Sequence, residues 1–212
     1  MKNHLFRMIC TGIAIFHFVP LAAVASSSDL HSYVRRYQST KLSHEAINRI
    51  SRYDHLIEYF TNFNYYVPNH KVSPEFIKAL ILAESGANPR AVSPKMAYGL
   101  GQIILSTGKE AGLELFKSTT HFKYVPKSTL KNITKEDLFD PATNILLTCF
   151  LISKYNYKFD GRLELVLSAW NAGENTDSLA KGNHAPYKET KDLIGKVNGY
   201  YLHLLRKKGA IR

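Results

Sequence analysis

The sequence predicts a mainly α-helical protein organised as one domain. Apolar residues recur at intervals of three and four along most of the 212-residue chain, which is typical of amphipathic helices. Alternating apolar and polar runs, which would indicate strands, are scarce, and no internal repeat, low-complexity tract or linker divides the chain. A chain of this length can bury a sizeable core without splitting into two domains.

Residues 1–25 are predicted to be an export signal. Basic residues precede an apolar run over residues 8–24, and Ala23-Val-Ala25 supplies the small residues of a cleavage site. The run is short for a membrane span and is interrupted by a histidine and a proline, so cleavage after Ala25 is favoured over retention as an anchor. We therefore expect a periplasmic or secreted bacterial protein with no integral membrane span after signal cleavage.

Residues 26–71 are predicted to form a helical N-terminal extension, and residues 72–212 the main domain. Ser43 opens the clearest helix of the extension. The Asn- and Tyr-rich stretch 62–69 is expected to be a loop. One amphipathic helix is predicted from the apolar or aromatic residues Ile47, Ile50, Tyr53, Ile57 and Phe60.

The main domain begins with a helix that Ser73 caps, a proline opens and Gly86 follows. The next segment, 88–94, contains two prolines and cannot remain helical. A short helix is expected over 108–116, and residues 117–132 are expected to be loop.

Three further helices complete the domain. Asp140 and Pro141 cap a helix that reaches about Tyr157, the next helix closes at Asn171-Ala-Gly173, and the last runs over about 187–207. Their inward positions are predicted to be Ala142, Ile145, Leu146, Cys149, Phe150, Leu163, Val166, Leu167, Trp170, Leu193, Ile194, Val197, Tyr201 and Leu204.

Cysteine content and charge limit the function classes. Cys10 would leave with the signal, and Cys149 lies in an apolar run that suits a buried inert thiol, so no disulfide or cysteine metal site is expected. Loss of two of the 28 basic residues with the signal leaves 26 against 17 acids, a formal charge of +9. No nucleic-acid-binding motif accompanies this charge, so an acidic wall polymer or a membrane surface is favoured over nucleic acid, and simple solubility also explains it.

Glu84 is the most unusual acid in the chain. Ile77, Leu80 and Ile81 form an apolar stripe at helical spacing, and the next position on that stripe is Glu84. Burial and the negative end of the helix dipole both favour the protonated form, and a neutral carboxylic acid is suited to general acid catalysis. A core-edge glutamate paired with a lysine or arginine is the alternative.

Four short segments carry a family resemblance. They are Ala83-Glu-Ser85, Gly99-Leu-Gly-Gln-Ile103, Ala169-Trp-Asn-Ala-Gly173 and Glu189-Thr-Lys191. In this order and spacing they resemble the soluble lytic transglycosylase family, whose pattern runs E-S, G-L-M-Q, A-Y-N-A-G and E-T-R, and the resemblance covers about residues 72–197.

The resemblance implies a lysozyme-like fold and an enzyme acting on peptidoglycan. Family members cleave the β-1,4 bond between N-acetylmuramic acid and N-acetylglucosamine without water and leave 1,6-anhydro ends. The residue matching the catalytic glutamate is Glu84, which would protonate the glycosidic oxygen and then deprotonate the C6 hydroxyl. The substrate's own N-acetyl and hydroxyl groups replace a second carboxylate. No metal or organic cofactor is implied.

The matching segments also supply expected substrate-binding residues. By the resemblance, Ser85 lies in the cleft, Gln102 offers its amide to the sugar, and Trp170 takes the position of a tyrosine close to the glutamate. Asn171 and Glu189 would contact the substrate. Simpler roles stay open: a hydrogen bond at a helix end for Ser85, a turn at Gln102 and packing for Trp170.

Some positions depart from the family pattern. An indole donates but does not accept a hydrogen bond, so Trp170 should stabilise the carboxylate of Glu84 and oppose the effect of burial. Gly101 stands where methionine is usual, Met96 stands where glycine is usual, and Leu193 replaces an aromatic residue. The Met96 side chain could in part replace the one absent at Gly101. We expect an altered sugar subsite.

Two other functions remain open. A hydrolytic muramidase would need a second carboxylate, for which Asp140 and Glu189 are the candidates. A protein of the same fold with weak or no turnover would bind glycan strands or join a cell-envelope secretion or conjugation apparatus. The extension over 26–71 would cover the back of the domain, lengthen the glycan groove or dock such a partner.

Overall fold

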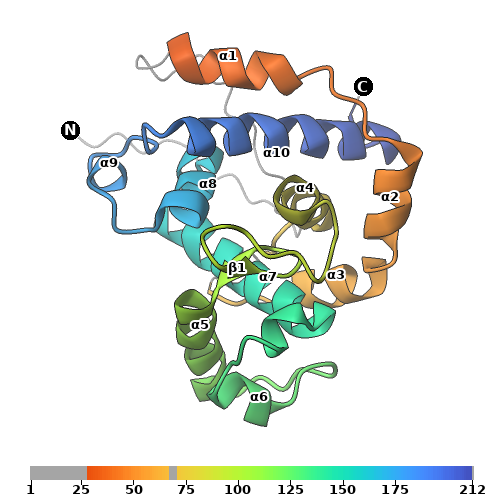
Figure 1. Ribbon diagram of the computed structural model, residues 1–212, viewed down its shortest axis with the longest axis vertical. Coiled ribbons are helices and arrows are strands. Elements are labelled where there is room, and N and C mark those ends of the chain that lie inside the picture. The colour runs from red at the N-terminus through yellow and green to blue at the C-terminus, as the bar shows by residue number, and fades with distance from the viewer. Residues whose placement is uncertain (1–27, 67–70, 212) are drawn as a thin grey trace, which may run out of the picture.

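Ten α-helices, one short 3-10 helix and a two-stranded sheet make up the described residues, 28–66 and 71–211, of the computed structural model (Figure 1). The prediction of a mainly helical fold is confirmed. The predicted export signal and residues 67–69 of the predicted loop lie outside the described residues. Within that part of the chain, no helix is long and apolar enough to cross a membrane.

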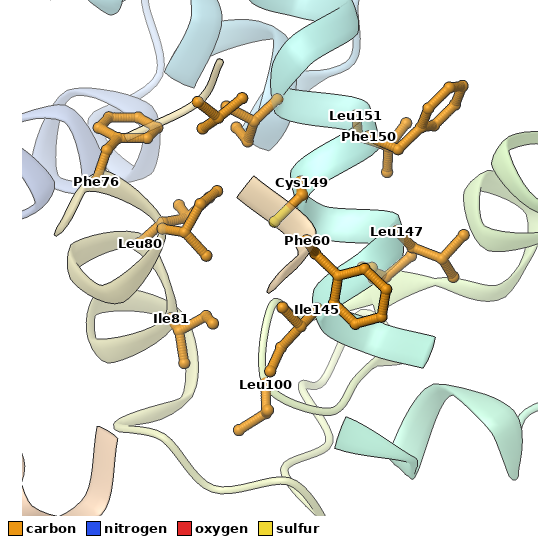
Figure 2. Close-up of a cluster of buried hydrophobic side chains, with 14 of the residues drawn as sticks. Phe60, Phe76, Leu80, Ile81, Leu100, Ile145, Leu147, Cys149, Phe150 and Leu151 are labelled. Atoms are coloured by element: carbon orange, nitrogen blue, oxygen red, sulfur yellow. The ribbon is translucent and has the colours of Figure 1, made fainter. Parts of the chain in front are cut away.

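Helix α7 (Pro141–Lys158) is the centre of the hydrophobic core. Asp140 caps it as predicted, accepting a hydrogen bond from the Thr143 amide at 2.8 Å. All five inward positions predicted for this helix are buried. Figure 2 shows Phe76, Leu80 and Ile81 of α4 (Pro74–Ser85) across from the α7 side chains. The free thiol of Cys149 is buried among them, and burial raises its pKa well above the usual value.

The helices that flank the functional motifs begin and end close to their predicted positions. Ser73 caps α4 and Gly86 ends it with φ +61°. Helix α8 (Leu163–Ala172) ends at Gly173, and α10 (Lys188–Lys207) follows after the single-turn α9 (Asp177–Ala180). The long helix α10 packs against both α4 and α8, and this packing brings their ends together.

The prediction of one helix between Ser43 and Phe60 is wrong. The chain forms α2 (His44–Ser51), turns at Arg52 and Tyr53, and continues as α3 (Asp54–Thr61). Helix α2 packs on α4, whereas α3 packs on both α4 and α7. The turn lets both helices bury an apolar face against different partners, which one straight helix could not do.

Helix α1 (Ser28–Tyr37) lies along α10, as Figure 1 shows. Two glycines of α10 make this close approach possible, because a Cβ at Gly195 would lie 2.6 Å from the Tyr33 carbonyl oxygen and one at Gly199 2.2 Å from that of Tyr37. Buried residues from α1, α2 and α3 belong to the same core cluster as those of α4 and α7. The segment predicted as an extension is therefore part of the core.

The region between α4 and α7 is more ordered than predicted. Helix α5 spans Leu105–Lys117 and is longer than the expected 108–116. The expected loop over 117–132 contains α6 (Lys127–Lys131), and the short 3-10 helix η2 (Asp137–Phe139) precedes α7. Close packing explains α6, because a Cβ at Gly112 of α5 would lie only 2.8 Å from the Leu130 carbonyl oxygen.

Candidate active site

The ends of three helices and one hairpin converge on Glu84. It lies in the last turn of α4, and Trp170 lies in the last turn of α8. The indole Nε1 of Trp170 donates a hydrogen bond to Oε1 of Glu84 at 2.7 Å. Strands β1 (Ala97–Tyr98) and β2 (Ile103–Ile104) flank Leu100, whose carbonyl accepts from Ser85, and Glu189 in the first turn of α10 is close enough for its charge to act on Glu84.

Glu84 is held close to the midpoint of its titration at neutral pH. Burial raises the pKa, the hydrogen bond from Trp170 and the charge of Lys196 lower it, and the charge of Glu189 raises it, which places the pKa at about 7. Part of the side chain still reaches solvent. Among the described residues no lysine or arginine forms an ion pair with Glu84. The paired core-edge interpretation therefore does not apply.

The hairpin between β1 and β2 carries the Gly-Leu-Gly-Gln motif. Gln102 has φ +56°, and its side-chain nitrogen donates to the carbonyl oxygens of Gly99 at 2.8 Å and Ala91 at 3.2 Å. The amide nitrogen thus supports the backbone. Only the amide oxygen is left to accept a hydrogen bond from a ligand.

Asn144 of α7 holds this hairpin in place through hydrogen bonds to its backbone. Its Oδ1 accepts from the Gly101 amide at 2.7 Å, and its Nδ2 donates to the carbonyl oxygens of Tyr98 and Leu138 at 3.0 and 2.8 Å. Every polar atom of this fully buried side chain is satisfied. The sequence places Asn144 within the stretch that resembles the family, but α7 contains other polar residues and nothing local indicates this role.

The suggestion that Met96 replaces the side chain absent at Gly101 is wrong. A Cβ at Gly101 would lie 2.3 Å from the Thr148 hydroxyl oxygen, so Thr148 of α7 occupies the space above this glycine. The Met96 side chain is instead 54% exposed. Met96 also has φ +59°, a conformation that favours glycine and costs about 1 kcal/mol or more for another residue.

Ser85 and Asn171 hold the parts of the site together. The Ser85 hydroxyl donates to the Leu100 carbonyl at 2.7 Å and to that of Ile81 at 3.2 Å, so it ties α4 to the hairpin. The Asn171 side-chain oxygen accepts from the hydroxyl of Thr190 at 2.6 Å. Thr190 is fully buried, and its role was not predicted although it follows Glu189 in the sequence motif.

The two candidate second carboxylates both have other partners. Asp140 caps α7 through its side chain. Glu189 forms an ion pair with Lys95 at 2.5 Å, and both side chains are exposed. In the described part of the chain no cluster of three His, Cys, Asp or Glu residues could hold a metal ion.

The known proteins that this chain resembles in sequence or structure include lytic transglycosylases. The profile of the Transglycosylase SLT domain family matches residues 61–193, more than half of the chain. A Haemophilus influenzae protein, named as a candidate soluble lytic murein transglycosylase, is 29% identical over an alignment of 198 residues that covers 84% of this chain and 31% of the relative. The chain thus spans about a third of that relative's length.

Two solved structures share the fold. One is an inactive mutant of the lytic transglycosylase Slt of Pseudomonas aeruginosa, with a TM-score of 0.53, 22% identity and coverage of 80% of this chain and 25% of that one. The other is the 70 kDa soluble lytic transglycosylase of Escherichia coli, with a TM-score of 0.51, 18% identity and coverage of 85% and 33%. Both matches cover the greater part of this chain and a minor part of the larger enzyme.

Proposed function

The chain belongs to the Transglycosylase SLT domain family, and on that premise we propose that it is a peptidoglycan lytic transglycosylase with Glu84 as its single acid/base. The observation that carries the proposal is the state of Glu84. It is a largely buried carboxyl with a pKa of about 7, no ion-pair partner among the described residues and one hydrogen-bond donor, Trp170. Such a group is ready both to give and to take a proton near neutral pH.

The first step is protonation of the glycosidic oxygen. The indole of Trp170 occupies Oε1 of Glu84 and is only a donor, so the proton of the neutral acid is carried on Oε2. When Oε2 transfers this proton, the bond between the muramic acid C1 and the glycosidic oxygen breaks. The N-acetyl group of the sugar stabilises the positive charge that develops at C1.

The second step returns the proton to Glu84. The Glu84 carboxylate accepts the proton of the C6 hydroxyl, and the C6 oxygen bonds to C1 to give the 1,6-anhydro end. Between the two steps Trp170 stabilises the carboxylate through its hydrogen bond. One carboxyl group thus acts as acid and then as base, and no water is consumed.

The neighbouring side chains are proposed to position the sugars. Gln102 offers its amide oxygen and Asn171 its amide nitrogen, since the other polar atom of each is already bonded within the protein. Ser85 holds the hairpin against α4. Glu189 is available at the start of α10, where its contact with a substrate would replace its ion pair with Lys95.

The hydrolytic alternative is less well supported by this site. A muramidase needs a second carboxylate that is free to activate water or attack the sugar. Asp140 is used to cap α7, and Glu189 is paired with Lys95. We therefore favour the reaction in which the substrate supplies the attacking hydroxyl.

We also propose that the protein acts in the bacterial cell envelope on peptidoglycan glycan strands. The predicted export signal and the positive charge of the mature chain support this location. Action beside a secretion or conjugation apparatus is a further proposal, which co-purification of the exported protein with such an apparatus would test.

Digestion of purified peptidoglycan by the wild type and by Glu84→Gln tests the proposed function. We expect soluble muropeptides with anhydro ends from the wild type and none from the variant, which keeps the size of the side chain and loses the proton transfer. Reducing-end products would indicate a muramidase. Retention on peptidoglycan without soluble products would indicate a binding protein.

A further inference from the structure

A hollow in the protein lies apart from Glu84. It has a volume of about 220 Å³ and opens between the loop before residue 67, helix α5 and the segment that follows α5. None of its lining residues belongs to the Glu84 site. The principal lining side chains are Tyr65, Tyr66, Glu114, Thr120, Phe122 and Phe150.

Aromatic rings form most of its walls. Phe150, which Figure 2 shows on α7, contacts Tyr65 at a ring-centroid distance of 5.8 Å and Tyr66 at 5.5 Å. Tyr65 also stacks on Phe122 at 6.5 Å with an angle of 28° between the rings. Tyr66 also stacks on Tyr157 at 6.1 Å and 17°. Tyr157 is 61% exposed, so the aromatic surface continues out of the hollow to solvent.

One side of the hollow is polar and rigidly held. Glu114 accepts a hydrogen bond from the Tyr66 hydroxyl at 2.8 Å and another from Lys154 at 2.7 Å. Burial acts to raise the pKa of Glu114, but the hydrogen bonds from Lys154 and Tyr66 outweigh it and lower the pKa below the usual value. Glu114 is therefore an ionised acceptor whose charge Lys154 already balances.

The lining excludes several kinds of ligand. Among the described residues the lining contains no lysine, arginine or histidine, so an anion would meet the carboxylate of Glu114 with no cationic lining residue to balance its charge. A cation would have to compete with Lys154 for that carboxylate. A wholly apolar ligand would remove water from Glu114 without replacing its hydrogen bonds. A neutral ring with one apolar face and hydroxyl groups at its rim meets none of these difficulties.

We propose that this hollow binds one neutral sugar residue of a glycan strand, as a second site outside the catalytic cleft. The apolar C–H face of a pyranose ring would contact the aromatic lining of the hollow, and its hydroxyls would donate to Glu114. The identity of the strand rests on the proposed function, in which the substrate is such a polymer. Binding at two sites would hold a long strand more tightly than a short one.

Titration with the trisaccharide of N-acetylglucosamine tests this site directly. With the Glu84→Gln protein and amide NMR detection, we expect shifts in residues 63–66 and 114–122 that vanish in Tyr66→Ala and Glu114→Gln. Tyr124→Ala, a partly exposed aromatic residue outside the lining, should keep them. Fluorescence of the only tryptophan, Trp170, reports separately on the catalytic cleft. The proposal would be overturned if a saturating concentration of the trisaccharide caused none of these shifts. It would also be overturned if an aromatic peptide caused them and the sugar did not.

Kinetics provide the second readout. Tyr66→Ala should raise KM for intact peptidoglycan about tenfold, while kcat/KM for a tetrasaccharide substrate stays at the wild-type value. Equal losses on both substrates, or a loss on neither, would contradict a second site. If the wild type cleaves nothing but the trisaccharide still shifts residues 63–66, the proposed function fails and the sugar site stands.

Discussion

Replacing Trp170 by phenylalanine tests how the site controls its acid. The substitution keeps an aromatic ring on α8 and removes the hydrogen bond that the indole donates to Glu84 at 2.7 Å. That bond stabilises the ionised form, so its loss must raise the pKa of Glu84. A hydrogen bond to a charged group contributes about 1.5–3 kcal/mol, and one pKa unit corresponds to about 1.4 kcal/mol.

The lower end of that range applies, because both side chains are only partly buried. We therefore expect the pKa of Glu84 to rise from about 7 in the wild type to about 8 in Trp170→Phe. The catalytic step begins from the protonated acid, so kcat/KM falls as pH rises through this pKa. The alkaline limb of the profile should move up by about one pH unit, and its plateau should fall because the new carboxylate loses its donor.

Two measurements check this prediction. The pH profile of kcat/KM shows the pH at which activity falls on the alkaline side. A carbon NMR titration of the labelled Glu84 carboxyl gives its pKa without turnover. Trp170→Tyr restores a donor hydroxyl and should return the limb toward the wild-type position. An unchanged or lower pKa in the phenylalanine variant, with its circular dichroism intact, would refute the assigned role of Trp170.

Three other predictions concern stability and positioning. The folded state raises the pKa of Glu84 to about 7, so ionisation of this carboxyl destabilises the fold. Glu84→Gln should therefore raise Tm at pH 8, by an amount that corresponds to about 1–2 kcal/mol of unfolding free energy after a discount for solvent screening. The gain in Tm should shrink as the pH falls below 7 and vanish below about 4.5. Thr190→Val removes the hydrogen bond to Asn171 and should lower kcat/KM for glycan about tenfold with an unchanged pH profile. Gly101→Ala places a Cβ 2.3 Å from the Thr148 hydroxyl and should cost about 1–3 kcal/mol in chemical denaturation, with partial recovery in the double variant with Thr148→Ala, whose Cβ would lie 3.5 Å away.

Each of these has a control or a contradicting outcome. A Tm gain from Glu84→Gln that is equal at pH 4 and pH 8 would contradict the raised pKa. Thr61→Val changes a buried threonine that bonds only to carbonyls of its own helix, and it should leave kcat/KM unchanged. If Gly101→Ala unfolds at the same denaturant concentration as the wild type, the space above Gly101 is not filled by Thr148 as described.

Local signals predicted much of the framework. Ser73 and Asp140 precede proline and cap α4 and α7, because a short polar side chain satisfies the free amides of a first helical turn wherever it stands. The position of Glu84 on an apolar stripe predicted its burial, since the spacing of a helix fixes which residues share a face. These features depend on neighbouring residues in the sequence.

Features that depend on distant residues were missed or predicted wrongly. The break between α2 and α3 exists because each helix packs on a different partner, and no residue at Arg52 or Tyr53 marks it. The bond from Thr190 to Asn171 forms only when α8 and α10 are in place. Similarly, the filling of the space above Gly101 comes from Thr148 on α7, which is far away in the sequence.

The fate of solvent oxygen tests the central claim most directly. Peptidoglycan digested by the wild type in water enriched in ¹⁸O should give muropeptides whose new ends contain no ¹⁸O, because the C6 hydroxyl and not water attacks C1. New ends that each carry one ¹⁸O atom would show that water completes the reaction. That result would contradict a mechanism with Glu84 as the only acid and base.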